Sequence, residues 1–298
     1  MARNSSLPER FRVAPGKRFE LADVDPGDTA GLEKEAAQVR LEQGIERLGE
    51  LQERLYAQDR WAVLLLFQGM DASGKDGVVK HVLSGINPAG CQVFSFKAPL
   101  HEELDHDFLW RAARALPERG RIGIFNRSYY EEVVTVRIHP EFLAKQRLPP
   151  RCVTKSIWDE RLEDIAGFER YLARSGVRLC KFFLHVSKEE QKRRFLERIE
   201  HPEKNWKFNQ SDVAERAHWD EYQRHWSTAI ASTSTEHAPW FVVPADKKWF
   251  TRLLVAEAVV CGLEELELDF PRLEGARKKE LAQARRALES EGAAKPRR

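Results

Sequence analysis

The feature that most constrains the fold is a short apolar run followed by a glycine-rich loop and a helical pattern. Residues 62–67 read Ala-Val-Leu-Leu-Leu-Phe, which is typical of a strand buried on both faces. The stretch Gly69-Met-Asp-Ala-Ser-Gly-Lys-Asp-Gly77 follows with the spacing G-x-x-x-x-G-K, and a helical pattern starts at Val78. A strand, a loop of this kind and a helix, in this order, predict an α/β fold whose loop binds phosphate.

The residue types of the loop suit an anion. Gly69 and Gly74 permit backbone angles and a close approach that a Cβ would block, so successive N–H groups can point inward. The helix start adds its positive dipole end, and Lys75 adds a full charge. The alternative is a glycine-rich turn with an exposed lysine, which the position after a strand disfavours. The residues expected to bind phosphate are Gly69, Ala72, Ser73, Gly74, Lys75, Asp76 and Gly77.

One position departs from the usual pattern of nucleotide-binding loops. The Ser or Thr that normally follows the lysine and binds magnesium is Asp76 here. A carboxylate at that position would repel phosphate unless it turns away or binds a metal. Asp71, inside the loop, is a candidate to hold Mg²⁺, or Mn²⁺, against the phosphates.

Further apolar runs alternate with helical patterns along the chain. The runs are residues 91–96, 121–125, 179–186 and 240–243, and the helical patterns are residues 104–116, 158–172 and 249–263. This alternation predicts one α/β domain with a five-stranded, mostly parallel sheet. We expect an N-terminal arm at 1–28, a single domain at 29–270 that begins with an amphipathic helix at 29–57, and a charged C-terminal helix and tail at 271–298.

Composition limits the class of protein and its partners. The chain has 49 Lys and Arg against 47 Asp and Glu, a formal charge of +2, so bulk charge holds it to neither nucleic acid nor membrane. A hydrophobic content of 42% excludes a disordered chain. The 4 cysteines form no close pair, and no apolar stretch follows the basic N-terminal residues. These features predict a cytoplasmic protein that binds neither nucleic acid nor membrane.

A second polar cluster follows the run at 121–125. Because ligands gather at the carboxyl ends of parallel strands, Asn126, Arg127 and Glu131 should face the phosphate loop. Asn126 stands where a magnesium-binding Asp is usual, and Glu131 is a candidate to supply the missing charge and to bind metal. The planar fork of Arg127 suits two phosphate oxygens. The alternative is a polar loop with a solvated arginine.

Two more segments are candidates for ligand contact. Residues 188–198 predict a helix capped by Ser187, with Arg194 and Arg198 on one face, and a loop with Lys204 and Lys207 follows. Together they form an expected lid at about 187–216, unless they are only a solvated helix with ion pairs. Lys97 follows the second strand, where nucleotide kinases handle the phosphate acceptor.

Several blocks of the sequence resemble a known family. They are Gly69–Gly77, Phe125-Asn-Arg-Ser-Tyr-Tyr-Glu131, Pro202-Glu-Lys-Asn-Trp-Lys-Phe208 and Trp240-Phe-Val-Val-Pro-Ala-Asp-Lys247. They look like the signature blocks of the second polyphosphate kinase family, and the likeness runs from about Gly31 to Leu266. Asn126 followed by Glu131 is similar to the class III members.

The resemblance implies a three-layer α/β/α P-loop kinase-like fold with a helical lid, and transfer of phosphoryl groups from inorganic polyphosphate to AMP and ADP. It implies that Asp71 is a metal ligand and catalytic carboxylate, that Lys75 and Arg127 hold the transferring phosphate, and that Glu131 serves AMP phosphorylation. The lid residues Arg194, Arg198, Lys204 and Lys207 would engage polyphosphate or nucleotide. Lys97, Asn126, Arg127 and Glu131 form the expected acceptor side, for adenine or also guanine nucleotides. We expect a homo-oligomer, a dimer or a tetramer.

Two other functions remain open from the sequence. An ATP-dependent nucleotide or nucleoside kinase would share the fold and the loop, although Asp76 and Asn126 count against it. A non-catalytic nucleic-acid-binding module would use the basic lid and tail. The carboxylates in the loop disfavour that module because they would repel a phosphate backbone.

Overall fold

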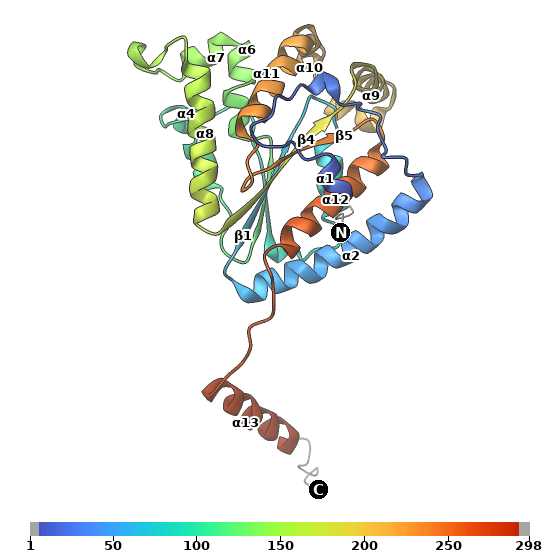
Figure 1. Ribbon diagram of the computed structural model, residues 1–298, viewed down its shortest axis with the longest axis vertical. Coiled ribbons are helices and arrows are strands. Elements are labelled where there is room, and N and C mark those ends of the chain that lie inside the picture. The colour runs from blue at the N-terminus through green and yellow to red at the C-terminus, as the bar shows by residue number, and fades with distance from the viewer. Residues whose placement is uncertain (1–5, 292–298) are drawn as a thin grey trace.

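The protein is built around one parallel β-sheet. A computed structural model describes residues 6–291 (Figure 1). The strands lie in the order β2-β3-β1-β4-β5, and each neighbouring pair is parallel. Their bounds are β1 (Ala62–Gln68), β2 (Cys91–Ser95), β3 (Ile122–Asn126), β4 (Val177–His185) and β5 (Trp240–Pro244). The five predicted strands are confirmed, with ends shifted by a residue or two.

The central strand is the most deeply buried element. Every residue of β1 is buried, because β3 and β4 pair with its two edges and helices cover both faces of the sheet. The register sets Phe67 of β1 beside Asn126 of β3. The carboxyl ends of these two strands, and the loops that follow them, therefore lie next to each other.

Longer helices form a layer on each side of the sheet (Figure 1). One layer contains α3 (Lys75–Val82) and α12 (Lys248–Glu264), with α2 (Lys34–Gln58) packed outside α12. The other contains α8 (Ile157–Arg174) and α11 (Trp219–Thr233). This arrangement confirms the three-layer α/β/α fold.

α12 is apolar on most of its surface because it lies between the sheet and α2. Arg40 of α2 forms a bidentate ion pair with Glu257 of α12, and both N–O distances are 2.9 Å. α2 begins at Lys34, slightly after the predicted start, and ends where Asp59 adopts a left-handed backbone (φ 52°).

The remaining helices lie in the segments between these elements or near the two ends of the chain. The α-helices are α1 (Leu7–Arg10), α4 (His101–Leu104), α5 (Trp110–Arg114), α6 (Thr135–Ile138), α7 (Pro140–Lys145), α9 (Lys188–Glu200), α10 (Gln210–Ala214) and α13 (Ala276–Glu291). The 3-10 helices are η1 (Leu21–Asp23), η2 (Pro88–Gly90), η3 (Tyr129–Glu132), η4 (Pro150–Cys152), η5 (Pro202–Lys207) and η6 (Glu215–His218).

The prediction of a single helix at 104–116 is wrong, because the chain forms α4 and α5 with a break between them. The break follows from Asp107, whose carboxylate accepts a bond from the backbone N–H of Leu109 at 2.9 Å. A side chain that bonds to the backbone in this way competes with helix continuation and favours a new helix start.

The two terminal segments differ in how they pack. The N-terminal arm pairs with the free edge of β5, where Val13 N–H donates to the Trp240 carbonyl and Val242 N–H donates to the Phe11 carbonyl, both at 2.9 Å. α13 extends away from the domain and has no buried residue (Figure 1). Residues 1–5 of the expected arm and 292–298 of the expected tail lie outside the described residues. Between residues 6 and 291, no helix has both the length and the apolar character needed to cross a membrane.

A buried polar cluster anchors the turn that follows β3. The ammonium of Lys181 on β4 is fully buried and bonds to the carboxylate of Glu169 on α8. The hydroxyls of Tyr129 and Tyr130, both in η3, donate to the same carboxylate at 2.9 and 2.8 Å. The start of η3 is therefore fixed to the core, and with it the residues on either side of the two tyrosines.

Candidate active site

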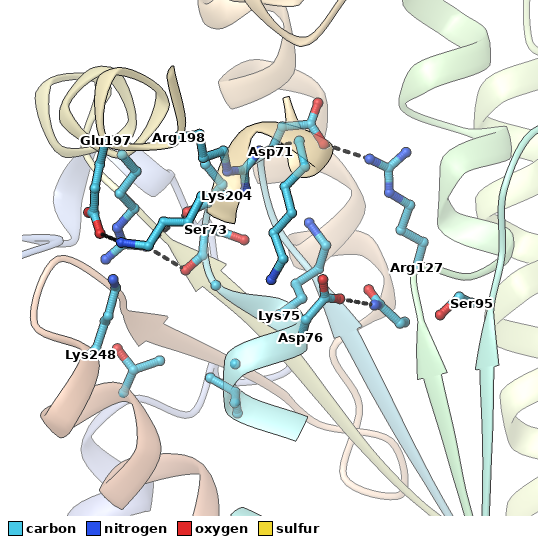
Figure 2. Close-up of a pocket in the computed structure, with 18 of the residues that line it drawn as sticks. Asp71, Ser73, Lys75, Asp76, Ser95, Arg127, Glu197, Arg198, Lys204 and Lys248 are labelled. Carbon is cyan, nitrogen blue, oxygen red and sulfur yellow. Dashed lines mark hydrogen bonds and ion pairs between the residues drawn. The ribbon is translucent and has the colours of Figure 1, made fainter. Parts of the chain in front are cut away.

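The loop between β1 and α3 has the backbone that its glycines predict. Gly69 and Gly74 have φ of 142° and 107°, and Ala72 between them has φ of 59°. A Cβ on Gly69 would lie 2.7 Å from the carbonyl oxygen of Leu184 on β4, so no larger residue fits there. Figure 2 shows Asp71, Ser73, Lys75 and Asp76 of this loop and the start of α3 around one cavity.

Lys75 is buried at the base of the loop. Its ammonium donates to the carbonyls of Gly69 at 2.7 Å and Met70 at 3.2 Å. Burial, reinforced by the charge of Arg127, lowers the pKa of Lys75 to about 8. An anion bound in the loop would favour the charged form of this lysine.

The hydroxyl of Ser73 is buried in the same loop. It has no hydrogen-bond partner among the described residues. A buried hydroxyl without a partner is a free donor for a ligand.

Asp76 lines the cavity at the start of α3. Its carboxylate accepts a bond from the side-chain amide of Asn126 at 2.6 Å (Figure 2). The loop after β1 and the end of β3 are thus linked by a side-chain bond at the two positions where the sequence departs from the usual pattern. This pairing places the carboxylate of Asp76 beside a donor.

Arg127 and Asp71 form an ion pair across the site, with an N–O distance of 2.5 Å (Figure 2). Arg127 has a left-handed backbone (φ 63°), and its N–H donates to the carbonyl of Phe67 at 2.9 Å. The negative charge of Glu131, more than that of Asp71, raises the pKa of Arg127. The expectation that the β3 cluster faces the phosphate loop is confirmed by this contact.

Glu131 lies behind Arg127 and outside the cavity lining. One of its carboxylate oxygens accepts a bond from the hydroxyl of Thr135 at 2.7 Å. With the Gln68 amide oriented to satisfy both of its ends, Gln68 donates to the other oxygen at 3.0 Å and accepts from Ser128 N–H at 2.9 Å. The carboxylate is therefore held rigidly beside Arg127.

The segment predicted to form a lid folds as α9, η5, α10 and η6. Its first helix is capped as expected, since the hydroxyl of Ser187 accepts a bond from Glu190 N–H at 3.0 Å. Lys204 of η5 reaches back to Glu197 of α9 (Figure 2), and Arg198 lies 3.6 Å from Asp212 of α10. The lid segments are thus joined to one another by ion pairs.

Arg194 of α9 supports the phosphate loop directly. Its guanidinium donates to the carbonyls of Ala72 at 2.9 Å and Ser73 at 2.8 Å, and also to the carbonyl of Ala245 after β5. Its Nε donates to Glu190 at 2.8 Å. The side chain is only 5% exposed, so its donors are committed to the protein.

These elements enclose one cavity of about 650 Å³. Most of the sequence-predicted site residues line it: Asp71, Ala72, Ser73, Gly74, Lys75, Asp76, Gly77, Lys97, Asn126, Arg127, Arg194, Arg198, Lys204 and Lys207. Gly69 and Glu131 lie outside the lining. Sequence reasoning missed Glu197 of the lid and Lys248 and Arg252 of α12, which also line it. The position of α12 directly after β5, at the ligand edge of the sheet, is the signal that points to the last two.

The carboxylates of the site suit a hard divalent cation that keeps most of its own water. Among residues 6–291 no group of three or more His, Cys, Asp or Glu side chains could hold a metal ion. Mg²⁺ needs only one or two carboxylates when phosphates supply the other oxygens. Asp71 meets this need at the cavity, and its charge, after burial, raises the pKa of the neighbouring Asp212. A cation beside Asp71 would offset this repulsion.

Comparison with known proteins agrees with this geometry. The family model described as "Polyphosphate kinase 2 (PPK2)" matches residues 31–271. An ADP-polyphosphate phosphotransferase of Rhodopseudomonas palustris is 50% identical, covering 94% of this chain and 98% of that one. An AMP/ADP-polyphosphate phosphotransferase of Meiothermus ruber is 44% identical, covering 91% and 98%.

A solved structure extends the likeness to three dimensions. The crystal structure of polyphosphate kinase 2 from Arthrobacter aurescens TC1 superimposes with a TM-score of 0.84 at 39% identity, covering 93% of this chain and 95% of that one. The sheet, the loop and the lid described above are therefore those of a P-loop kinase-like fold. The chain belongs to the polyphosphate kinase 2 family.

Proposed function

We propose that this protein transfers the terminal phosphoryl group of inorganic polyphosphate to AMP and ADP, which forms ADP and ATP. The observation that carries the proposal is a cavity where the phosphate loop lies between a lid and the end of β3 and where lysines and arginines far outnumber carboxylates. Such a lining suits two polyanions brought together. The names of the two relatives given above describe phosphotransferases that use polyphosphate with ADP, or with AMP and ADP.

The main barrier to this reaction is repulsion between two anions. An acceptor phosphate oxygen is already ionised near neutral pH, so the site has little proton transfer to perform. Alignment and neutralisation of charge then provide the catalysis. The backbone N–H groups of the loop, Lys75 and Arg127 are the groups that hold the transferring phosphate in this mechanism.

Asp71 is the proposed ligand of Mg²⁺ or Mn²⁺, with Glu131 as a second candidate held behind Arg127. When bound, the cation neutralises charge on the phosphate oxygens. The negative charges of Glu131 and Asp71 both raise the pKa of the Arg127 guanidinium. It remains fully charged and available to a phosphate.

The acceptor side is the part of the cavity over β3 and β2. Lys97 after β2, Asn126 and Arg127 line it, and Glu131 supports it from behind. We assign the phosphate of AMP or ADP to this side. Lys204 and Lys207 of the lid, with Arg198, lie across the cavity and are the groups proposed to close over the phosphates and exclude water. Arg194 is proposed to act by holding the loop.

The test is to mix the protein with long-chain polyphosphate, Mg²⁺ and AMP and to measure ADP and ATP by chromatography. Both products are expected in sequence, ADP first. A parallel reaction replaces polyphosphate with ATP and AMP with a nucleoside. Transfer from ATP alone, without any transfer from polyphosphate, would contradict the proposal and favour an ATP-dependent kinase.

Two further expectations stay predictions. The protein is expected to form a dimer or a tetramer, which light scattering of the purified protein measures. A location in the cytoplasm is expected from the composition and from the metabolites that the proposed reaction uses.

A further inference from the structure

The cavity extends past the phosphate loop onto a wall that the proposed roles leave unused. This wall is formed by α12, whose residues Lys248, Thr251 and Arg252 line the cavity. In Figure 2 Lys248 lies on the side of the loop opposite Arg127 and Ser95, near Glu197 and Lys204. Lys248 and Arg252 are four residues apart, so they share one face of the helix.

The order of the strands divides the cavity into two arms. β3 and β2 lie on one side of β1 and β4 and β5 lie on the other. Residues that follow β2 and β3, such as Lys97 and Arg127, line the first arm. α12 follows β5, so Lys248 and Arg252 line the second arm. The phosphate loop, which follows the central strand, lies between the two arms.

The two cations of the second arm differ from three of the four lid cations that line the cavity, of which only Lys207, among the described residues, likewise lacks a carboxylate within 4.0 Å. Arg194, Arg198 and Lys204 each have a carboxylate partner within 4.0 Å. The side chains of Lys248 and Arg252 have no hydrogen bond or ion pair to any residue in the described part of the chain. Two adjacent cations that line a cavity without a carboxylate partner favour an anionic ligand.

The neighbourhood of these cations is also positive. After burial, the charge of Arg252 is the largest cause that lowers the pKa of His81 on α3. The hydroxyl of Thr251, which lies between the two cations, donates to the carbonyl of Pro244 at 2.9 Å. The nearest carboxylate, Glu197 of the lid, is paired with Lys204. The wall therefore offers a ligand mainly its two cations.

This chemistry does not suit a nucleobase. Bases bind on aromatic faces and to hydrogen-bonding groups of both kinds. Among the described residues that line the cavity the aromatic side chain is Phe96, and it belongs to the first arm, after β2. A nucleoside is therefore better accommodated on the acceptor side, and the second arm is left to phosphate groups.

We propose that Lys248 and Arg252 bind the phosphates of a long polyphosphate chain that lie beyond the one held by the phosphate loop. This inference rests on the proposed function, because it names where the rest of that donor chain lies. It adds a binding site on α12 to the loop and the lid. A donor of only three phosphates would make fewer contacts with Lys248 and Arg252 than a long chain does.

The experiment compares the wild type with a Lys248→Ala/Arg252→Ala double variant. KM is measured with ADP as acceptor, for long-chain polyphosphate and for tripolyphosphate, which is used as donor or as competitive inhibitor. The KM for the long chain should rise about tenfold, and the constants for tripolyphosphate and for ADP should each change less than about twofold. The slope of log KM against log salt for the long chain should become shallower by about two, one for each cation removed.

Lys247→Ala is the matched control. Lys247 is the neighbouring exposed lysine and does not line the cavity, so this variant should keep the wild-type KM for both donors. Lys248→Gln and Arg252→Gln single variants, checked for an unchanged melting temperature, provide a second measurement if the double variant folds poorly.

Each outcome decides between the ideas. If the double variant transfers phosphate at the wild-type rate and has an unchanged KM for the long chain, the α12 site is overturned and the proposed function stays intact. A rise in the KM for ADP instead would assign the second arm to the nucleotide and overturn the inference. Absence of transfer from polyphosphate by the wild type would overturn the proposed function itself, and no variant is needed to see it.

Discussion

Arg127 shows how much of the site depends on single residues. Its backbone has a positive φ, which is uncommon for a residue with a long side chain and costs free energy. The cost is offset by the bond from its N–H to Phe67 and by the ion pair with Asp71. These contacts fix the guanidinium between the phosphate loop and the acceptor side.

Asp71→Asn and Lys75→Ala should each lower kcat for transfer from polyphosphate to ADP by at least about 100-fold, because each removes a charge that acts on the reacting phosphates. Steady-state kinetics at saturating ADP measures the loss. Lys34→Ala, which removes an exposed lysine at the start of α2, is the control and should keep wild-type rates. Near wild-type turnover in either site variant would refute the assigned roles.

Glu131→Ala should harm the use of AMP more than the use of ADP. We expect the ratio of kcat/KM for AMP to kcat/KM for ADP to fall about tenfold. Thr135→Val removes the bond to the Glu131 carboxylate and keeps its charge, and should give a smaller fall in the same direction. Equal losses with both acceptors would remove the special role of Glu131.

At the scale of elements, hydrogen bonds join α9, the first helix of the lid, to the phosphate loop. Arg194 of α9 bridges the loop carbonyls of Ala72 and Ser73 to the segment after β5. Burial of Arg194 and its bonds to Glu190 and to four carbonyls make it a positioning residue for the loop. The pKa of Glu190 is lowered to about 2, chiefly by hydrogen bonds from Arg193, so the carboxylate that holds Arg194 stays charged in neutral solution.

Arg194→Lys keeps the charge but cannot span all five acceptor groups. We expect the KM for polyphosphate to rise at least about fivefold and the melting temperature to fall by a few degrees, about what the loss of one or two buried hydrogen bonds causes. Arg198→Lys should have a smaller effect on the melting temperature, because Arg198 makes one long bond to the Lys207 carbonyl and one ion pair of 3.6 Å. Equal effects on the melting temperature would contradict the bridging role.

At the scale of the whole molecule, the core holds a buried ion pair that joins the sheet to one helix layer and to the turn after β3. Lys181 of β4 and Glu169 of α8 are 0% and 1% exposed, and the tyrosines of η3 share the same carboxylate. Lys181→Met leaves Glu169 buried without its cation. The free energy of unfolding should fall by about 3–5 kcal/mol, as measured by urea titration.

The double variant Lys181→Met/Glu169→Gln tests the reason for that loss. It removes both charges and keeps an oxygen that accepts the tyrosine hydroxyl bonds. Most of the lost stability should return, because the cost comes from the unpaired charge. A double variant as unstable as Lys181→Met would show that packing at Lys181, not charge, is decisive.

Acid should destabilise the molecule in a defined range. Burial, with the charges of Arg137 and Arg224, lowers the pKa of His225 on α11 from an ordinary 6.5 to about 4. As the pH falls from about 6.5 to about 4, the unfolded chain takes up a proton that folded His225 does not, so stability falls. In His225→Gln the free energy of unfolding should decrease less between pH 7 and pH 5 than in the wild type. An identical decrease would contradict the assignment.

The sequence by itself determined the parts that depend on neighbours along the chain. The apolar run at 62–67, the glycines at 69 and 74 and the cap at Ser187 predicted β1, the phosphate loop and α9, because periodicity, backbone freedom and capping act over a few residues. The break between α4 and α5 escaped this reasoning, because one Asp107 bond outweighed the helical spacing around it.

Only the tertiary structure decided which side chains meet across the sheet. The order β2-β3-β1-β4-β5 brings Arg127 to Asp71 and Asn126 to Asp76, and it places Arg252 on the far side of the phosphate loop from Lys97. It also turns Arg194 into a support for the loop and takes Glu131 out of the cavity lining. These outcomes depend on distances between strands far apart in sequence, which the packing of the sheet and its helix layers sets and local patterns do not encode.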